Sequence, residues 1–171
     1  MAGLLPPSHP GLCFLPELSR PLPFSGLFEY ALDAKGRLTV PAKYRASLAG
    51  GVVLTLSAAT EETGARALGI WPAAAYETFA QGVLQGMSPI SPKARALQRV
   101  LYGNAFELEL DSAHRLTIPS KAREYAGLSK DVVITGAGEY LEVWDKAAQE
   151  SDNEALLAQF PELVASLDSV D

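Results

Sequence analysis

The sequence contains very little cysteine and histidine, and it has no long apolar stretch. Its single cysteine, Cys13, excludes an internal disulfide framework and any metal site built from several cysteines, so a reducing, cytoplasmic setting is expected. His114 has no second histidine or cysteine near it in the sequence, and we expect neither a metal nor a cofactor. The longest apolar runs, such as 52–54, are far shorter than the roughly 20 residues that span a bilayer, which predicts a soluble protein without membrane contact.

Basic residues are in the minority, with 14 Lys and Arg against 20 Asp and Glu and a formal net charge of −6. This balance would argue against nucleic acid as a partner if the charge were evenly spread. Residues 131–171, however, contain ten acids and one base, so the preceding 130 residues carry a net charge of +3. A distribution of this kind permits a basic binding face on an acidic protein.

One stretch of the chain occurs twice. Residues 28–45 and 106–123 align without a gap and share ten of eighteen positions, in the pattern Leu-Asp-x-x-x-Arg-Leu-Thr-x-Pro-x-Lys-x-Arg. Each copy is followed by an apolar strand pattern and then by a strand that carries a Trp. Because a unit of about fifty residues buries too little surface to be secure alone, we predict a tandem duplication that forms one pseudo-symmetric core.

The boundaries of the predicted segments follow from composition and periodicity. Residues 1–23 hold six of the twelve prolines and no apolar signal-peptide core, and are expected to be a disordered head with Cys13 as an incidental thiol. The remaining segments are a first repeat over 24–82, a linker helix within 83–104, a second repeat over 105–150 and an acidic amphipathic tail over 151–171.

Each repeat is expected to contain the same elements in the same order. Alternation at Phe28, Tyr30 and Leu32 predicts a half-buried strand, and Gly36 can supply the positive φ of a hairpin turn. The first repeat is then predicted to continue with a strand at 37–40, a helix from Pro41 to about Leu48, strands at 52–57 and 67–71, and a helix that begins at Pro72. The second repeat is predicted to have its turn at 112–114 and a helix from Pro119.

Two helical segments are predicted outside these units. Ser91 and Pro92 are start signals and Gly103 is a stop signal for the linker helix. Arg95 and Arg99 lie four residues apart on its outward face. They are either solvated charges or functional residues, and a functional pair would contact a phosphate or form a protomer interface. In the tail, we expect one or two short amphipathic helices, with Pro161 between them.

An Asp-x-x-x-Arg sequence spans the hairpin turn in both repeats, as Asp33 to Arg37 and Asp111 to Arg115. An Asp that enters a tight turn can accept backbone N–H bonds, and its carboxylate can also hold a guanidinium in a fixed orientation. The pair could simply stabilise the turn, although a hairpin does not need a guanidinium. Because each Asp has its own Arg, the ionised carboxylate is favoured over a general acid, and we expect no enzymatic activity.

Several bases lie close to these turns in the sequence. With Gly36 and His114 at matching turn positions, the two motifs together offer seven candidate DNA-binding residues: Lys35, Arg37, Lys43, Arg45, Arg115, Lys121 and Arg123. Brought together by a pseudo-twofold axis, they would suffice for a phosphate-binding face. Lys43 and Arg45 are two residues apart on a helix and do not share a face, and the same holds for Lys121 and Arg123. One residue of each pair is therefore expected to be structural or solvated. His114 is more consistent with a turn residue than with a ligand.

The doubled motif, together with Val143-Trp144-Asp145 and Phe160-Pro161, closely resembles the MraZ family of bacterial transcriptional regulators. This family lies within the swapped-hairpin superfamily that includes the AbrB-type regulators, and the resemblance covers residues 24 to 167. It implies an α+β, mainly β fold in which two tandem AbrB-like swapped-hairpin units form one pseudo-twofold barrel with flanking helices. It also implies a nucleoid-associated homo-oligomer, a head-to-tail ring, that binds double-stranded DNA at direct repeats in the promoter of the division and cell-wall gene cluster, usually as a repressor.

The same resemblance implies roles for individual residues. Arg37 and Arg115 would contact DNA, Asp33 and Asp111 would orient them, and Lys35 would be a further phosphate contact. His114 differs from the Gly that is usual at this turn in the family, and the head before the first strand is also unusual. The alternative from another class is a ring-forming interaction scaffold whose basic turns bind the acidic groups of a protein partner.

Overall fold

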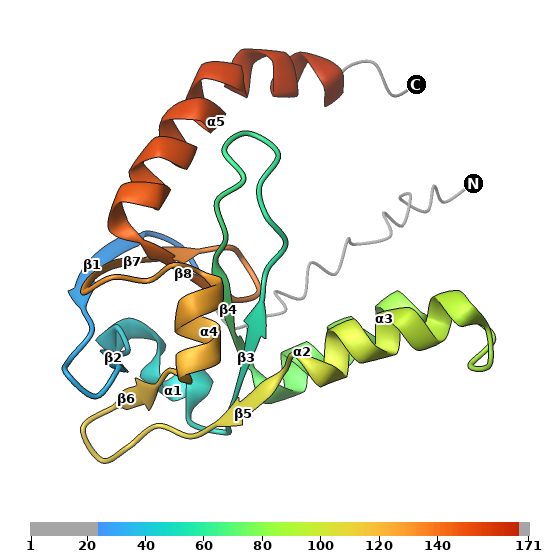
Figure 1. Cartoon of the computed structure of the whole chain (residues 1–171), viewed down its shortest axis with the longest axis horizontal. Helices are drawn as coiled ribbons and strands as arrows, with labels where there is room; N and C mark the ends of the chain where they lie inside the picture. Colours follow the sequence, from blue (N-terminus) through green and yellow to red (C-terminus); the bar gives the residue numbers. More distant parts are fainter. Residues whose placement is uncertain (1–23, 168–171) are drawn as a thin grey trace, which may run out of the picture.

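The computed structural model describes residues 24–167, so the predicted head with Cys13 and the last four residues of the tail, 168–171, lie outside the described part. The described chain is a mixed α/β structure whose elements follow one another as two tandem units (Figure 1). Helices account for more of these residues than strands do, so the expectation of a mainly β protein is not confirmed.

The elements of the two units have the following bounds. The first unit contains β1 (Leu27–Ala31), β2 (Arg37–Thr39), η1 (Ala42–Tyr44), α1 (Arg45–Leu48), β3 (Val52–Leu56), β4 (Leu68–Pro72) and α2 (Ala73–Leu84). After α3 (Pro92–Gly103), the second unit contains β5 (Phe106–Leu108), β6 (Arg115–Thr117), α4 (Ser120–Tyr125), β7 (Asp131–Gly136), β8 (Leu141–Asp145) and α5 (Lys146–Leu167). The predicted order of elements is therefore confirmed in both units, with boundaries that shift by one or a few residues.

The strands of the two units pair with each other. Six strands form one antiparallel sheet in the order β1-β7-β8-β4-β3-β5, and β2 and β6 form a separate two-stranded antiparallel ladder. The first strand of each unit pairs with a strand of the other unit, β1 with β7 and β5 with β3. Neither unit therefore completes its share of the sheet alone, as the small size of one repeat predicts.

The register of these strands shows an approximate twofold axis. In the ladder, Leu38 lies opposite Leu116, its counterpart in the second repeat, so the axis passes through this pair. In the large sheet, the counterparts Gly69 and Glu142 lie opposite each other at the centre of the β4–β8 pairing. The sheet order is unchanged when the units are exchanged, because β1 corresponds to β5, β3 to β7 and β4 to β8. These pairings support the predicted pseudo-symmetric arrangement.

The main core lies on one face of the large sheet. Leu38 and Leu116 of the ladder have no exposed surface and join one apolar cluster with Leu54 of β3 and Ile134 of β7. On the other face, Val53 packs with Trp71 and Tyr76 in a smaller cluster that α2 covers. This alternation along β3 is expected for a strand buried on both faces, and it places the ladder and its turns on the core side of the sheet.

The helices outside the sheet confirm one prediction and contradict another. α3 begins as expected, with the Ser91 hydroxyl oxygen accepting a hydrogen bond of 3.1 Å from the Ala94 N–H and with Pro92 in the first turn. α5 is one helix of 22 residues with Pro161 inside it, so the prediction of separate helices at Pro161 is wrong. Proline removes one N–H donor from the helix, and because Leu157 and Pro161 are exposed, water can bond the carbonyl left without its partner.

Two hydroxyl groups attach α5 to the body of the protein. Asp152 is only 4% exposed, and its Oδ1 accepts hydrogen bonds from the hydroxyls of Thr60, at 2.6 Å, and Thr63, at 2.7 Å. Beyond this point α5 extends away from the sheet (Figure 1). No helix within residues 24–167 has both the length and the apolar character that crossing a membrane requires.

Candidate nucleic-acid interface

The turns that connect β1 to β2 and β5 to β6 contain the same hydrogen-bonding pattern. The prediction that the strands on either side of each turn pair as a hairpin is wrong, because β1 pairs with β7, β5 with β3, and β2 with β6. In the first turn, Asp33 Oδ1 accepts from the backbone N–H groups of Lys35 and Arg37, both at 2.9 Å, and Asp33 Oδ2 accepts from Arg37 Nε. The carboxylate therefore shapes the turn with one oxygen and orients the guanidinium with the other. Both functions that the sequence left as alternatives are present in one side chain.

The second turn repeats this arrangement around Asp111. Its Oδ1 accepts from the N–H groups of Ala113 and Arg115, both at 2.9 Å. Its Oδ2 lies 2.9 Å from both Nε and Nη2 of Arg115. Because β2 and β6 are paired, Arg115 also reaches the other repeat, with Nη1 3.9 Å from Asp33 Oδ2. Nothing in the sequence pattern indicated this contact between the repeats.

The carboxylates of both turns are ionised at neutral pH. Backbone hydrogen bonding from Arg37, followed by its guanidinium, holds the pKa of Asp33 below its ordinary value of 3.8. The guanidinium of Arg115 is the main cause of the lowered pKa of Asp111. A carboxylate with a lowered pKa in the folded state contributes stability above its ordinary pKa and loses that contribution as pH falls through the folded-state pKa. The arginines are thus held by charged partners throughout the neutral range.

Arg37 and Arg115 are oriented without being buried. Their side chains are 28% and 31% exposed. Arginine has five N–H donors in a planar fork, so each guanidinium that bonds its own Asp can still offer donors to an outside acceptor. The arrangement can therefore present two fixed cationic groups, related by the approximate twofold axis, to one anionic surface.

The turn positions Gly36 and His114 share one unusual backbone conformation. Their φ angles are 73° and 56°, and His114 is the one residue other than glycine with a positive φ among residues 24–167. Each closes its turn by donating its N–H to the carbonyl of the leading Asp, at 2.9 Å for Gly36 and 2.8 Å for His114. The departure from Gly at 114 therefore leaves the geometry of the second turn intact.

This conformation predicts that His114→Gly stabilises the protein. The left-handed region costs a residue with a Cβ about 1–2 kcal/mol, part of which the greater freedom of glycine in the unfolded chain offsets. We expect a gain of about 0.5–1 kcal/mol, or roughly 1–4 °C in Tm. Thermal unfolding followed by circular dichroism would measure it, and an unchanged or lower Tm would contradict the strain.

The matched comparison is Gly36→Ala, which adds a Cβ at the turn position of the first repeat that corresponds to His114. Gly36 has a positive φ, and a Cβ added there would lie 2.7 Å from Cζ of Arg123. We expect Gly36→Ala to lower the Tm, because the new methyl group both strains the backbone and displaces this guanidinium.

The same close approach shows where two further predicted bases lie. Arg123, on α4 of the second repeat, covers the turn of the first repeat at Gly36, and its Nη2 bonds the Ser120 hydroxyl at 3.1 Å. Its counterpart Arg45 shares a surface hollow with Asp111 and His114 of the second turn, and donates from Nε to the Val40 carbonyl at 3.1 Å. Each helix thus brings an arginine to the turn of the other repeat, which the linear sequence did not indicate.

The three predicted lysines differ in position. Lys35 is exposed on the first turn itself, and Lys121 is exposed on α4. Lys43 lies with Nζ 3.4 Å from Ser25 Oγ and 5.1 Å from the ring centre of Tyr44. Lys43 is therefore directed to the segment before β1, whereas Lys35, Arg37, Arg115, Arg45 and Arg123 gather at the turns.

Comparison with known proteins gives a consistent result. The family model described as "MraZ protein, putative antitoxin-like" matches residues 24–100 and again residues 101–159, one match for each half of the duplication. A protein of Nitrosomonas europaea named transcriptional regulator MraZ is 41% identical over 128 residues, which is 72% of this chain and 82% of the relative. Relatives with the same name from Dehalococcoides mccartyi and Mycobacterium bovis are 34% and 41% identical, over 85% and 75% of this chain and 98% and 85% of their own length.

These matches span most of the described chain and both copies of the Asp-x-x-x-Arg turn. Taken with the duplicated architecture and the paired turns, they show that the chain belongs to the MraZ family.

Proposed function

We propose that this chain is a transcriptional regulator that binds double-stranded DNA through the turn face, the surface formed by the two Asp-x-x-x-Arg turns. The observation that carries the proposal is the pair of arginines, Arg37 and Arg115, each fixed by its own carboxylate and still about one-third exposed. The relatives named transcriptional regulators support this role over an enzymatic one.

In this proposal, Arg37 and Arg115 recognise the DNA sequence, and the remaining basic side chains position the DNA. A guanidinium held through Nε can direct its other N–H groups to a phosphate or to the O6 and N7 atoms of a guanine. Preorganisation by Asp33 and Asp111 lowers the entropy cost of binding, because the long side chains are already oriented. Lys35, Arg45, Arg123 and Lys121 would contact phosphates, while Lys43 would contribute at the periphery or to the fold.

The finer features implied by the family belong to the same proposal. The two repeats, 24–82 and 105–150, would form a swapped-hairpin barrel, with the linker and the acidic tail free for assembly. Several chains in a head-to-tail ring would bind direct repeats in the promoter of the division and cell-wall cluster as a nucleoid-associated repressor. Linking several weak contacts can raise avidity by roughly 10²–10⁴, so spacing of the DNA repeats would determine affinity.

The test is a titration of the purified full chain against its own upstream promoter DNA and a scrambled DNA of equal length, over a series of salt concentrations. We expect tighter binding to the promoter, with log K falling by about 0.9 per log salt for each phosphate neutralised. Equal affinity for both DNAs would indicate a nonspecific role. Absence of binding even at low salt would favour the ring-forming scaffold. The observation that supports the scaffold is the net charge of −6, because a negative net charge taken alone argues against nucleic acid as a partner.

A further inference from the structure

The second turn contains a strained residue whose side chain the fold does not use. His114 has a φ of 56°, and its exposed side chain makes no hydrogen bond or ion pair within residues 24–167. Its backbone holds the turn through the carbonyl of Asp111 and the N–H of Val40, and other residues could supply the same backbone groups. Residues kept in a costly backbone conformation cluster at functional sites. The imidazole is therefore the part of His114 whose presence the fold does not explain.

The two turns do not carry the same charges at their tips. The first turn has Lys35 directly before Gly36, whereas the second has Ala113 directly before His114. The arginine that follows is common to both turns. Because histidine changes its charge between pH 5 and 8, His114 can supply the second turn with the additional positive charge that Lys35 gives the first, but only when the imidazole is protonated.

The helix arginine beside each turn is also placed differently. Arg123 lies so close to the buried Gly36 that an added Cβ would be 2.7 Å from its Cζ, and its Nε is buried without a hydrogen-bond partner among the described residues. Its counterpart Arg45 donates from Nε to the Val40 carbonyl and lines a surface hollow of about 660 Å³ with His114. A guanidinium thus covers the tip of the first turn, while the tip of the second turn is open to a ligand.

The charged groups that face the imidazole balance one another. The hollow beside His114 is lined by Arg45 on α1 and by Glu109 and Asp111 on the chain that leads into the turn. Asp111 is bonded to Arg115, which leaves Glu109 and Arg45 as one charge of each sign. A nearby anion favours the protonated form of a histidine, so a phosphate brought to this turn would shift the imidazole towards its charged form.

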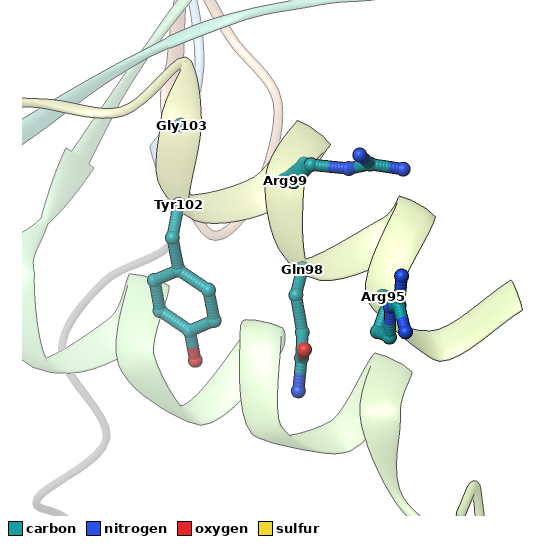
Figure 2. Close-up of a pocket in the computed structure, with 5 residues that line it drawn as sticks. All are labelled: Arg95, Gln98, Arg99, Tyr102 and Gly103. Atoms are coloured by element: carbon teal, nitrogen blue, oxygen red, sulfur yellow. The ribbon is translucent and has the colours of Figure 1, made fainter. Parts of the chain in front are cut away.

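The exposed arginines of α3 cannot supply the missing charge at the second turn. Arg95 and Arg99 line a separate hollow on α3 with Tyr102, and Figure 2 shows Arg99 extending away from the neighbouring helix. In Figure 1, α3 projects on the side of the molecule away from the turn between β5 and β6. A phosphate at the second turn would therefore meet His114 and not these arginines.

We propose that protonated His114 contacts a phosphate of the bound DNA and makes the affinity of the turn face for DNA dependent on pH. This inference rests on the proposed function, to which it adds a contact that only the second turn provides. Protonated imidazole has two N–H donors, and a hydrogen bond from a charged donor to a phosphate is stronger than one between neutral groups. The two turns would then bind DNA unequally, and DNA would bind more tightly at pH 6 than at pH 8.

The carboxylates of the turns do not produce the same pH dependence. The pKa values of Asp33 and Asp111 are lowered by their hydrogen bonds to Arg37 and Arg115. Both carboxylates therefore remain ionised from pH 6 to pH 8, and both turn arginines keep their partners throughout this range. A change in DNA affinity between these pH values would have to come from another group.

The test compares His114→Asn and His114→Gly with wild type in the full chain. Asparagine tolerates a positive φ and keeps a hydrogen-bonding group that does not titrate, whereas glycine removes the side chain. Fluorescence anisotropy would give the affinity for the promoter DNA at pH 6 and pH 8 at one ionic strength. We expect wild type to bind about 10-fold more tightly at pH 6 and both variants to bind equally at the two pH values. At pH 6 the salt slope of wild type should exceed that of the variants by about 1.

Two controls separate this contact from other effects. The sequence has one further histidine, His9, outside the described residues, and His9→Gln should keep the pH dependence of wild type. Thermal unfolding at both pH values separates DNA binding from stability. His114→Gly is expected to raise the Tm and yet to weaken DNA binding at pH 6, whereas a purely structural role would move stability and affinity in the same direction.

Each other outcome contradicts the inference in its own way. A pH dependence that persists in both His114 variants would place the titrating group elsewhere. Variants that bind as tightly as wild type at pH 6, while binding still requires Arg37 and Arg115, would reject the contact and leave the proposed function intact. A loss of affinity that is equal at both pH values would reject a charged contact. A wild type that binds neither promoter nor scrambled DNA would reject the proposed function, and this inference with it.

Discussion

Replacing Arg37 and Arg115 together with alanine is expected to weaken binding to the promoter DNA by about 100-fold or more, since a good bidentate arginine contact contributes about 1–3 kcal/mol. Both guanidinium groups are held by Asp33 and Asp111 and are about one-third exposed. The substitution removes two preorganised donors from each chain, and the salt slope should fall by about 1 for each phosphate that the variant no longer neutralises. A binding titration at fixed salt, followed by a salt series, would measure both effects.

The interpretation depends on an intact fold and assembly. The ion pairs at the turns are partly exposed, and pairs of this kind contribute little to stability, so the melting temperature and oligomeric mass should remain close to wild type. Lys93→Ala, which removes an exposed base of α3 and not of a turn, is the matched control and should bind normally. An unfolded or dissociated double variant would make the arginines structural, and unchanged binding would place the DNA site elsewhere.

Leu38→Ala is expected to cause the largest loss of stability. Leu38 and Leu116 face each other on the approximate twofold axis, and neither has exposed surface. Truncating a buried leucine removes apolar contacts and leaves a cavity, at a cost of about 2–5 kcal/mol. For a chain of this size that corresponds to a fall in Tm of roughly 4–20 °C. Urea unfolding at equilibrium would give the change in free energy directly.

Two controls separate cavity formation from a general effect of substitution. Ile90 is 83% exposed in the connection between α2 and α3, so Ile90→Ala should change the free energy of unfolding by no more than about 0.5 kcal/mol. Leu38→Met keeps most of the volume and should cost less than about 1.5 kcal/mol. A loss in Leu38→Ala as small as that in Ile90→Ala would show that the ladder is not part of the core.

Local features of this fold could be predicted from the sequence because local interactions determine them. The Asp-x-x-x-Arg turns depend on hydrogen bonds between residues at most four positions apart. The start of α3 depends on Ser91 and the residues that directly follow it. Duplication made the prediction of the turns more secure, since the pattern had to be consistent with two copies of the sequence.

Contacts between the repeats could not be predicted in this way. The pairing of β1 with β7, the approach of Arg115 to Asp33 and the position of Arg123 over Gly36 all join residues far apart in the chain. Periodicity shows which face of a strand is buried, but not which strand lies beside it. The continuity of α5 through Pro161 was missed because an exposed proline can be tolerated where water replaces the missing hydrogen bond.

The exchange of strands between the units also constrains how the protein can fold during synthesis. β1 leaves the ribosome well before its partner β7, which is complete only when the chain has been extended beyond Thr135. β3 likewise lacks its outer neighbour until β5 has been made. Long-range pairings of this kind slow folding and leave strand edges open in the meantime. The nascent first repeat therefore has exposed strand edges, and two chains made close together on one messenger could complete each other's sheets before either closes on itself.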